Sequence, residues 1–201
     1  MIQSQDRRCP AWSLDNRVRR WLSPPRLDVD LLEPIPGDRV VDLGAGVGYL
    51  TPSLLDRLGS AGELILVEPN PKAGAVLRAR WEVDGRVRIF QASAGDVPMI
   101  PGESQDRAVL SLVLCCMVDK RGALDEAWRI LRPGGLALVS YPEPGWRLRT
   151  VQRSLQLSRR LWDGLVVAHP WKVRRSFRRL LVRRHLLEKP AVASPLGARS
   201  G

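Results

Sequence analysis

Two acidic residues follow apolar segments in the first half of the chain, and one of them precedes a run of glycines. Residues 40–49 read Val-Val-Asp-Leu-Gly-Ala-Gly-Val-Gly-Tyr, with Asp42 two residues before the first glycine. Glycines at the end of a parallel strand let the backbone approach a ligand closely. A carboxylate at that place repels a pyrophosphate and attracts a cation. The spacing therefore favours a ligand with a positively charged group over a dinucleotide, whose G-x-G-x-x-G pattern would also need a glycine at Tyr49.

Glu68 is the second acidic candidate, because it ends the apolar segment 63–68. It follows the glycine loop by about twenty residues, where an acid can accept hydrogen bonds from both hydroxyls of a ribose. The alternative interpretation is an exposed carboxylate at a strand end. The order of strand, glycine loop, helix and distal acid indicates a single ligand site, so we expect Asp42 and Glu68 to share it.

The elements that position these acids alternate between short apolar runs and segments of helical periodicity. Near-continuous apolar strands between helices are typical of a parallel sheet covered on both faces. We therefore predict an α/β fold with a doubly wound, mostly parallel sheet of about seven strands and helices on both faces. The expected strands are 39–43, 63–68, 86–91, 107–114 and 136–141, and the expected helices are 48–58, 71–82 and 121–131.

The two ends of the chain are read separately. Leu14, Val18, Trp21 and Leu22 recur at helical spacing, and we expect the Ser-Pro-Pro sequence at 23–25 to end this helix. Residues 1–36 would form a helix that packs its tryptophans in the core, or, as the family resemblance described below implies, a helical lid over the ligand site. We expect the main domain over 37–189 and a disordered tail over 190–201.

The segment between 147 and 189 allows two interpretations. We expect a helix over 147–160, a strand over 165–168, and a second strand over 177–187 that pairs with it. A basic amphipathic helix over 171–187 is the alternative. We favour the strand pair because Val182 and Leu186 lie off the apolar stripe of that helix.

Composition limits the class of protein. With 201 residues and 44% hydrophobic content, the chain suits one globular domain. No apolar stretch is long enough for a transmembrane segment, and the N-terminus lacks the apolar core of a secretion signal. Three cysteines, two of them adjacent, fit a reducing compartment, so we expect a cytoplasmic protein. No cysteine or histidine spacing typical of zinc occurs, and no metal site is predicted.

Positive charge is concentrated in one region. The formal net charge is +11, and residues 147–190 hold eleven Arg and two Lys against Asp163 and Glu188, which accounts for the whole excess. A solvated arginine-rich surface is one interpretation. The other is a patch for an anionic partner, such as RNA, a phosphorylated ligand or a membrane surface, because clustered positive charge concentrates anions.

Residues 37–145 resemble the class I S-adenosylmethionine-dependent methyltransferases, which have a Rossmann-like fold. The resemblance implies that the loop after Asp42 contacts the amino-acid part of S-adenosyl-L-methionine, that Glu68 binds its ribose and that Pro69 packs on its adenine. An acid that recognises adenine in this family is replaced by Ser93, which leaves backbone and hydroxyl contacts. The cofactor-binding residues implied are Asp42, Gly44, Ala45, Gly46, Tyr49, Glu68, Pro69, Ser93, Ala94 and Leu112.

The resemblance also implies the chemistry, which is an in-line displacement on a sulfonium methyl group. The protein then supplies chiefly alignment and desolvation, and a proton acceptor is needed only for acceptors such as alcohols. Asp119, Tyr141 and Glu143 follow the fourth and fifth strands and are the catalytic candidates. A covalent role for Cys115 or Cys116 is disfavoured, because buried thiols are usually inert and no cation is evident near them.

The acceptor class follows from the segment 111–116. It lacks the Pro-Pro-Tyr or Pro-Pro-Phe sequence of enzymes that methylate the amino groups of bases, and its apolar Leu-Val-Leu-Cys-Cys run resembles the small-molecule branch of the family. We therefore expect methyl transfer to a small-molecule acceptor. The alternatives are an RNA methyltransferase or RNA-binding relative that uses residues 147–190, and a non-catalytic binding module in which Ser93 reflects lost activity.

Overall fold

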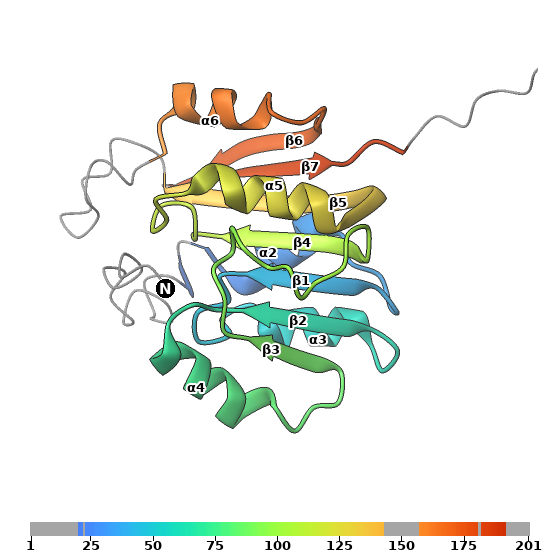
Figure 1. Ribbon diagram of the computed structural model, residues 1–201. Helices are drawn as coiled ribbons and strands as arrows, with labels where there is room; N and C mark the ends of the chain where they lie inside the picture. The colour runs from blue at the N-terminus through green and yellow to red at the C-terminus, as the bar shows by residue number, and fades with distance from the viewer. Residues whose placement is uncertain (1–19, 22, 143–156, 181, 192–201) are drawn as a thin grey trace, which may run out of the picture.

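The centre of the molecule is a seven-stranded mixed sheet in the order β3-β2-β1-β4-β5-β7-β6 (Figure 1). The computed structural model describes residues 20–21, 23–142, 157–180 and 182–191. The strands are β1 Arg39–Leu43, β2 Glu63–Val67, β3 Val87–Phe90, β4 Gln105–Ser111, β5 Leu131–Pro142, β6 Lys172–Arg179 and β7 Val182–Glu188. The first five are parallel, and β7 is antiparallel to both β5 and β6. The predicted α/β fold and mostly parallel sheet are confirmed.

Five helices within these ranges cover the two faces of the sheet. They are α2 Pro25–Leu32, α3 Thr51–Leu58, α4 Pro71–Trp81, α5 Lys120–Ile130 and α6 Arg159–Val166. Alternate strand residues point to opposite faces, so Val40 joins the core under α2, α3 and α4 while Val41 joins the core under α5 and α6. No helix in the described part of the chain is long and apolar enough to cross a membrane.

The predicted strands of the parallel half agree with the structure to within a few residues, apart from the boundaries of β4 and β5. β4 ends at Ser111 rather than at 114, because Leu112 has a left-handed φ of 58° that turns the chain out of the sheet. β5 begins at Leu131, five residues before the predicted start at 136, since the Pro-Gly-Gly turn forms an irregularity at the start of that strand. The strand ends nearest the site are therefore set by backbone conformation rather than by apolar content.

Helix α2 was not predicted, because its proline was read as the end of the preceding helix. Pro25 instead occupies the first turn of α2, where a missing N–H costs nothing. Val29 and Leu32 of α2 are buried against the sheet, so this part of the predicted lid 1–36 packs within the domain. Residues 1–19 and 192–201, on which the lid and the disordered tail were predicted, lie outside the described residues.

The predicted strand at 165–168 is wrong, and so is the alternative helix over 171–187. Leu165 is the inward residue of α6, together with Trp162 three positions earlier, and both are buried. The strand pair exists but consists of β6 and β7, with the chain turning after Arg179 inside the segment predicted as one strand. The predicted helix over 147–160 falls mostly outside the described residues, and α6 begins only at Arg159.

A buried ion pair joins α2 to β7. Arg184 is fully buried, and its Nε donates to Asp28 Oδ1 at 2.6 Å while its Nη2 donates to Ser23 Oγ at 2.5 Å. The second oxygen of Asp28 accepts from Ser111 Oγ at 2.8 Å, and Ser140 Oγ donates to Ser111 Oγ at 3.2 Å. This network links the first and last described elements to the ends of β4 and β5.

His185 lies on the opposite face of β7, beneath α6. Its ring stacks on Trp162 with centroids 4.1 Å apart, and its Nε2 is 3.1 Å from the Tyr141 hydroxyl. Burial, and secondarily the charge of Arg183, lowers the pKa of His185 to about 4. The imidazole is therefore neutral in the folded protein at neutral pH.

The first prediction concerns the buried ion pair. Asp28→Ala leaves the Arg184 guanidinium buried without its counter-charge, and we expect a loss of about 3–5 kcal/mol in the free energy of unfolding in urea. Asp30→Ala on the same helix is the control, since Asp30 and Arg57 form an exposed pair, and it should cost far less. Equal effects of the two substitutions would show that the pair does not hold α2 to the sheet.

The second prediction concerns His185 and pH. Its pKa is about 4 when folded and about 6.5 when unfolded, so the unfolded chain binds the extra proton between these values and stability falls as pH drops through them. We expect the wild type to lose roughly 2 kcal/mol over this window, less than the full shift because residual solvent screens the charge. His185→Gln should flatten the slope, and Tyr141→Phe should retain it. A His185→Gln protein with the wild-type slope would refute the assignment.

Candidate functional site

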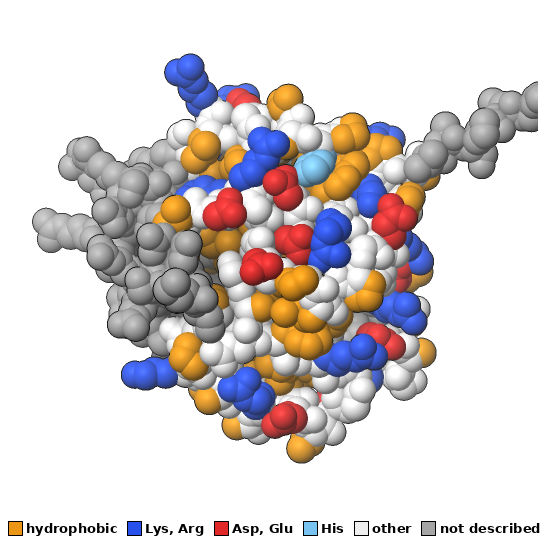
Figure 2. All heavy atoms as spheres, viewed as in Figure 1, with side chains coloured by type: hydrophobic (Ala, Val, Ile, Leu, Met, Phe, Trp, Pro, Cys, Tyr) orange, Lys and Arg blue, Asp and Glu red, His pale blue; other side chains and the backbone are white. Residues whose placement is uncertain are grey.

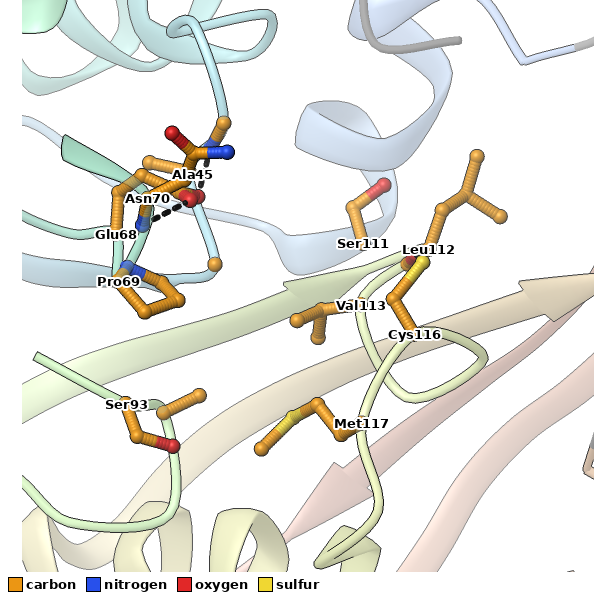
Figure 3. Close-up of a pocket in the computed structure, with 13 residues that line it drawn as sticks. Ala45, Glu68, Pro69, Asn70, Ser93, Ser111, Leu112, Val113, Cys116 and Met117 are labelled. Atoms are coloured by element: carbon orange, nitrogen blue, oxygen red, sulfur yellow. Dashed lines mark hydrogen bonds between the residues drawn. The ribbon is translucent and has the colours of Figure 1, made fainter. Parts of the chain in front are cut away.

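A hollow that is open to solvent lies at the carboxyl ends of β1, β2 and β4 (Figure 3). This is the edge at which parallel α/β sheets bind ligands. Loops that follow four successive strands of the sheet contribute to it. The residues that line it are Gly44, Ala45, Gly46, Glu68, Pro69, Asn70, Ser93, Ala94, Ser111, Leu112, Val113, Cys116 and Met117.

The glycine loop after β1 forms one wall and needs its glycines. Gly44 and Gly46 have φ values of +91° and +60°, which side chains rarely adopt. A Cβ atom on Gly44 would lie 2.3 Å from Val113 Cγ2, so the loop passes in direct contact with the segment after β4. The N–H groups of Gly44 and Ala45 donate to Val67 O at 2.8 and 2.9 Å, which fixes the loop to β2.

Glu68 anchors this loop from the next strand end. Its Oε2 accepts from the Gly46 N–H at 2.8 Å, and its Oε1 accepts from the Asn70 N–H at 2.9 Å (Figure 3). Each carboxylate oxygen can accept more than one hydrogen bond. The side chain can therefore hold the loop and still accept from the hydroxyls of a ligand.

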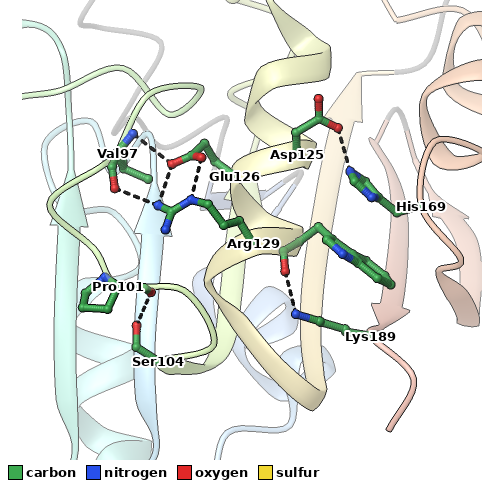
Figure 4. Close-up of polar contacts among 9 residues, drawn as sticks. Val97, Pro101, Ser104, Asp125, Glu126, Arg129, His169 and Lys189 are labelled. Carbon is green, nitrogen blue, oxygen red and sulfur yellow. Dashed lines mark hydrogen bonds and ion pairs between the residues drawn. The ribbon is translucent and has the colours of Figure 1, made fainter. Parts of the chain in front are cut away.

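A loop after β3 supplies Ser93 and Ala94, and α5 holds that loop in place. Glu126 Oε2 accepts from the Val97 N–H at 3.0 Å, and Arg129 Nη2 donates to Val97 O at 2.9 Å (Figure 4). The hydrogen bond from Arg129 is the main cause that lowers the pKa of Glu126, so this carboxylate stays ionised. Ser93 Oγ accepts only a long 3.4 Å bond from the Gly95 N–H.

The wall after β4 is apolar and strained. Leu112 has a left-handed φ of 58°, unusual for a side chain of this kind, and its N–H donates to Ser140 O at 2.9 Å. Val113 and Met117 follow it along the same wall. The hollow thus combines one carboxylate with an apolar side, and none of its lining residues is Lys or Arg.

Eight of the ten predicted cofactor residues line the hollow, and two do not. Asp42 is buried at the end of β1 beside the loop, outside the lining set. Tyr49 is buried as well, and its hydroxyl donates to Ser23 O at 3.0 Å beneath the loop. The structure therefore brings Glu68 and the glycines together but places Tyr49 in a packing position.

None of the described catalytic candidates lines the hollow. Asp119 caps α5, with Oδ1 accepting from the Gly122 N–H at 2.8 Å. Tyr141 is buried with its hydroxyl toward His185. Glu143 lies outside the described residues.

Two features near the site were missed from the sequence. Asn70 lines the hollow and caps α4, with its Oδ1 accepting from the Lys72 N–H at 2.9 Å; an asparagine before a proline at a helix start is the signal that could have found it. Lys120 is a buried cation near Cys115, where no cation was expected. Its Nζ donates to Met117 O at 2.6 Å, and burial lowers its pKa against the opposing charge of Cys115.

The chemistry of the lining fits S-adenosyl-L-methionine. Its sulfonium is attracted by carboxylates such as Glu68, and a phosphate ligand would find no Lys or Arg among the lining residues. The glycine loop packs directly against Val113, where a Cβ on Gly44 would collide. Within the described ranges, no group of three or more His, Cys, Asp or Glu side chains could hold a metal ion.

Comparison with known proteins agrees with this reading of the site. Residues 41–139 match a family model described as a methyltransferase domain. The chain is 35% identical over 117 residues to the ubiquinone/menaquinone biosynthesis C-methyltransferase UbiE of Vibrio campbellii, which covers 57% of this chain and 45% of that protein. It therefore spans less than half the length of this relative.

Solved structures share the fold at low sequence identity. A SAM-dependent methyltransferase from Aquifex aeolicus has a TM-score of 0.77 at 15% identity, covering 89% of this chain and 96% of that one. The [4+2]-cyclase SpnF has a TM-score of 0.70 at 17% identity, covering 89% and 85%. These structures show the fold, and together with the methyltransferase-domain match and the UbiE relative they support a class I S-adenosylmethionine-dependent methyltransferase.

Proposed function

We propose that the chain transfers the methyl group of S-adenosyl-L-methionine to a small organic acceptor. The observation that carries the proposal is the hollow itself, in which Glu68 anchors a glycine loop opposite the apolar wall of Leu112, Val113 and Met117. When bound, the cofactor supplies an electrophilic methyl group. The residues of the chain then bind and orient the cofactor and the acceptor, and they exclude water from the reacting atoms.

Each side of the hollow has its own part in this function. Glu68 and the N–H groups of the loop would hold the ribose and amino-acid parts, and Pro69, Ser93 and Ala94 would flank the adenine. Asp42, at the buried end of β1, would add negative charge near the sulfonium. The apolar wall after β4 would face the acceptor and keep water away from the reacting atoms.

The acceptor is proposed to be already nucleophilic at the reacting atom. The relatives named above are C-methyltransferases of quinone biosynthesis, and an electron-rich ring carbon of that kind needs no strong base. Tyr141 contacts a histidine whose pKa is about 4, which makes that histidine a weak proton acceptor. Asp119 and Glu143 are kept as candidates for a proton acceptor at the acceptor side.

The third prediction tests cofactor binding. Glu68→Gln replaces an acceptor oxygen by an NH₂ group that meets an N–H of Gly46 or Asn70, and it removes a charge-assisted bond to the ribose. We expect the Kd for S-adenosylhomocysteine, measured by calorimetry, to rise about 10–100-fold. Glu63→Gln, at the other end of β2 and exposed, is the matched control. Equal Kd values for the two variants, both folded, would remove Glu68 from the binding site.

The fourth prediction tests transfer. The protein is incubated with cofactor labelled on the methyl group and with fractionated cell extract, and label is expected in a small-molecule fraction. Glu68→Gln should reduce it and Glu63→Gln should not. Label in RNA instead would support the RNA methyltransferase alternative, and saturable cofactor binding without transfer to any fraction would support a binding or non-transferring role.

A further inference from the structure

We propose that the turn between β6 and β7, together with the start of α6, docks the active-site edge of the domain on an anionic lipid surface. The consequence of this docking for the acceptor, a molecule dissolved in the lipid, rests on the proposed function.

The turn lies at the same edge of the sheet as the hollow. Pro142, the last residue of β5, pairs with Val182, and Val182 also pairs with Arg179 at the end of β6. Since β5 is parallel to β4, whose end lines the hollow, the turn is roughly 10–14 Å from that wall at ordinary strand spacing. Figure 1 shows the start of α6 at this same edge.

The residues of the turn are not those that a tight turn favours. Only residues 180 and 181 separate the paired Arg179 and Val182, and a two-residue hairpin turn prefers Asn-Gly because its residues need positive φ. Both positions are leucine in the sequence. Leu180 has a φ of +53° and its side chain is 42% exposed. Leucine there costs free energy in the backbone and leaves an apolar group in water, so folding stability does not account for it.

Cations surround this apolar tip. Residues 157–191 hold ten Lys and Arg against two Asp and Glu. Arg184 is buried with Asp28, and Arg174 and Arg175 form ion pairs at the surface with Glu188 and Glu33. Arg179 is exposed at the end of β6.

Two further cations stand at the start of α6. Arg159 and Arg160 are exposed in its first turn, where the helix dipole disfavours positive charge. An anionic surface at this edge would offset that cost. Figure 2 shows Lys and Arg side chains beside hydrophobic ones over α6.

The mixture favours lipid over RNA. Aliphatic side chains next to Lys and Arg are the chemistry of a bilayer interface, where the apolar groups insert and the cations contact headgroups. Leu161 is 42% exposed beside Arg160, in addition to Leu180 at the tip. Stacking on RNA bases needs accessible aromatic rings, and in the described part of this region Trp162 and Trp171 are buried while Phe177 on β6 is half-buried.

Docking in this orientation would bring the acceptor side of the hollow toward the bilayer. Quinone-like acceptors with apolar tails partition into lipid, so they could enter the site without crossing water. The proposed function thereby gains a substrate class, namely small acceptors dissolved in a membrane.

The fifth prediction is tested by sedimentation of the full chain with vesicles. We expect binding to phosphatidylcholine vesicles that contain phosphatidylglycerol, weak binding to phosphatidylcholine alone, and a decrease with salt. Leu180→Asn should lower the affinity about tenfold, because a leucine no longer inserts, while the melting temperature stays the same or rises since Asn tolerates positive φ. Arg159→Gln with Arg160→Gln should also lower it about tenfold or more.

Matched control variants distinguish docking at this site from a general effect of surface charge or of exposed aliphatic side chains. Arg80→Gln with Arg88→Gln removes two exposed cations near β3, at the opposite end of the sheet, and Val83→Asn removes an exposed aliphatic side chain there. Both should bind vesicles as the wild type does. Equal binding by the Leu180 and Val83 variants, or vesicle binding that ignores lipid charge, would overturn the proposal.

The remaining outcomes are also decisive. Retention of polyuridylic acid that depends on Arg159 and Arg160 but not on Leu180, with no vesicle binding, would reject the lipid surface in favour of RNA. Vesicle binding that needs Leu180, in a protein that transfers no label to any acceptor, would retain the docking surface and reject the proposed function.

Discussion

The buried pair of Asp28 and Arg184 is the interaction on which the active-site edge depends. The two residues are 156 positions apart, and both are withdrawn from water. Burying two charges is favourable only when each is fully hydrogen-bonded, because dehydration otherwise exceeds their attraction. Ser23 accepts a further hydrogen bond from the guanidinium, and Ser111 donates one to the carboxylate. Since Ser111 is the last residue of β4 and lines the hollow, the wall of the site is held by a helix and a strand that never touch the ligand.

A second anchor, on the other side of the hollow, explains its shape. Glu68 holds the glycine loop to β2, and the serine network holds the end of β4. The strands β1 and β4 both leave the sheet through a residue of positive φ, which is Gly44 after β1 and Leu112 after β4. At Gly44 this conformation is free of steric cost and lets the loop touch Val113. At Leu112 it is strained, and the bond from its N–H to Ser140 O offsets part of that cost. The hollow is therefore bounded by two strand ends that hydrogen bonds hold to neighbouring strands.

The parallel half of the fold could be predicted because its signals are local. The apolar runs of β1 and β2 and the glycine loop between β1 and α3 need no distant partner to be recognised. The failures were positions that only tertiary contacts decide. Pro25 fits either the end or the start of a helix, and residues 165–168 fit a strand until Trp162 and Leu165 are seen to join one buried cluster under α6. In the site, eight of the residues expected from the loop pattern and the family resemblance line the hollow, whereas the packing of Tyr49, the cap at Asp119 and the burial of Lys120 depend on partners that spacing does not reveal.

The composition of the hollow bears on how the reaction proceeds. Among its lining residues Glu68 is the ionisable group, and it is engaged with the loop, whereas Cys116 is disulfide-bonded and does not titrate. The Tyr141 hydroxyl is turned toward a histidine that protonates only near pH 4. The described residues can then promote the reaction by aligning an acceptor that has its own nucleophilic atom and by excluding water from it. A [4+2]-cyclase has the same fold, so the fold alone does not dictate the reaction, and it is the carboxylate, the glycine loop and the apolar wall that favour the proposed methyl transfer to a small acceptor.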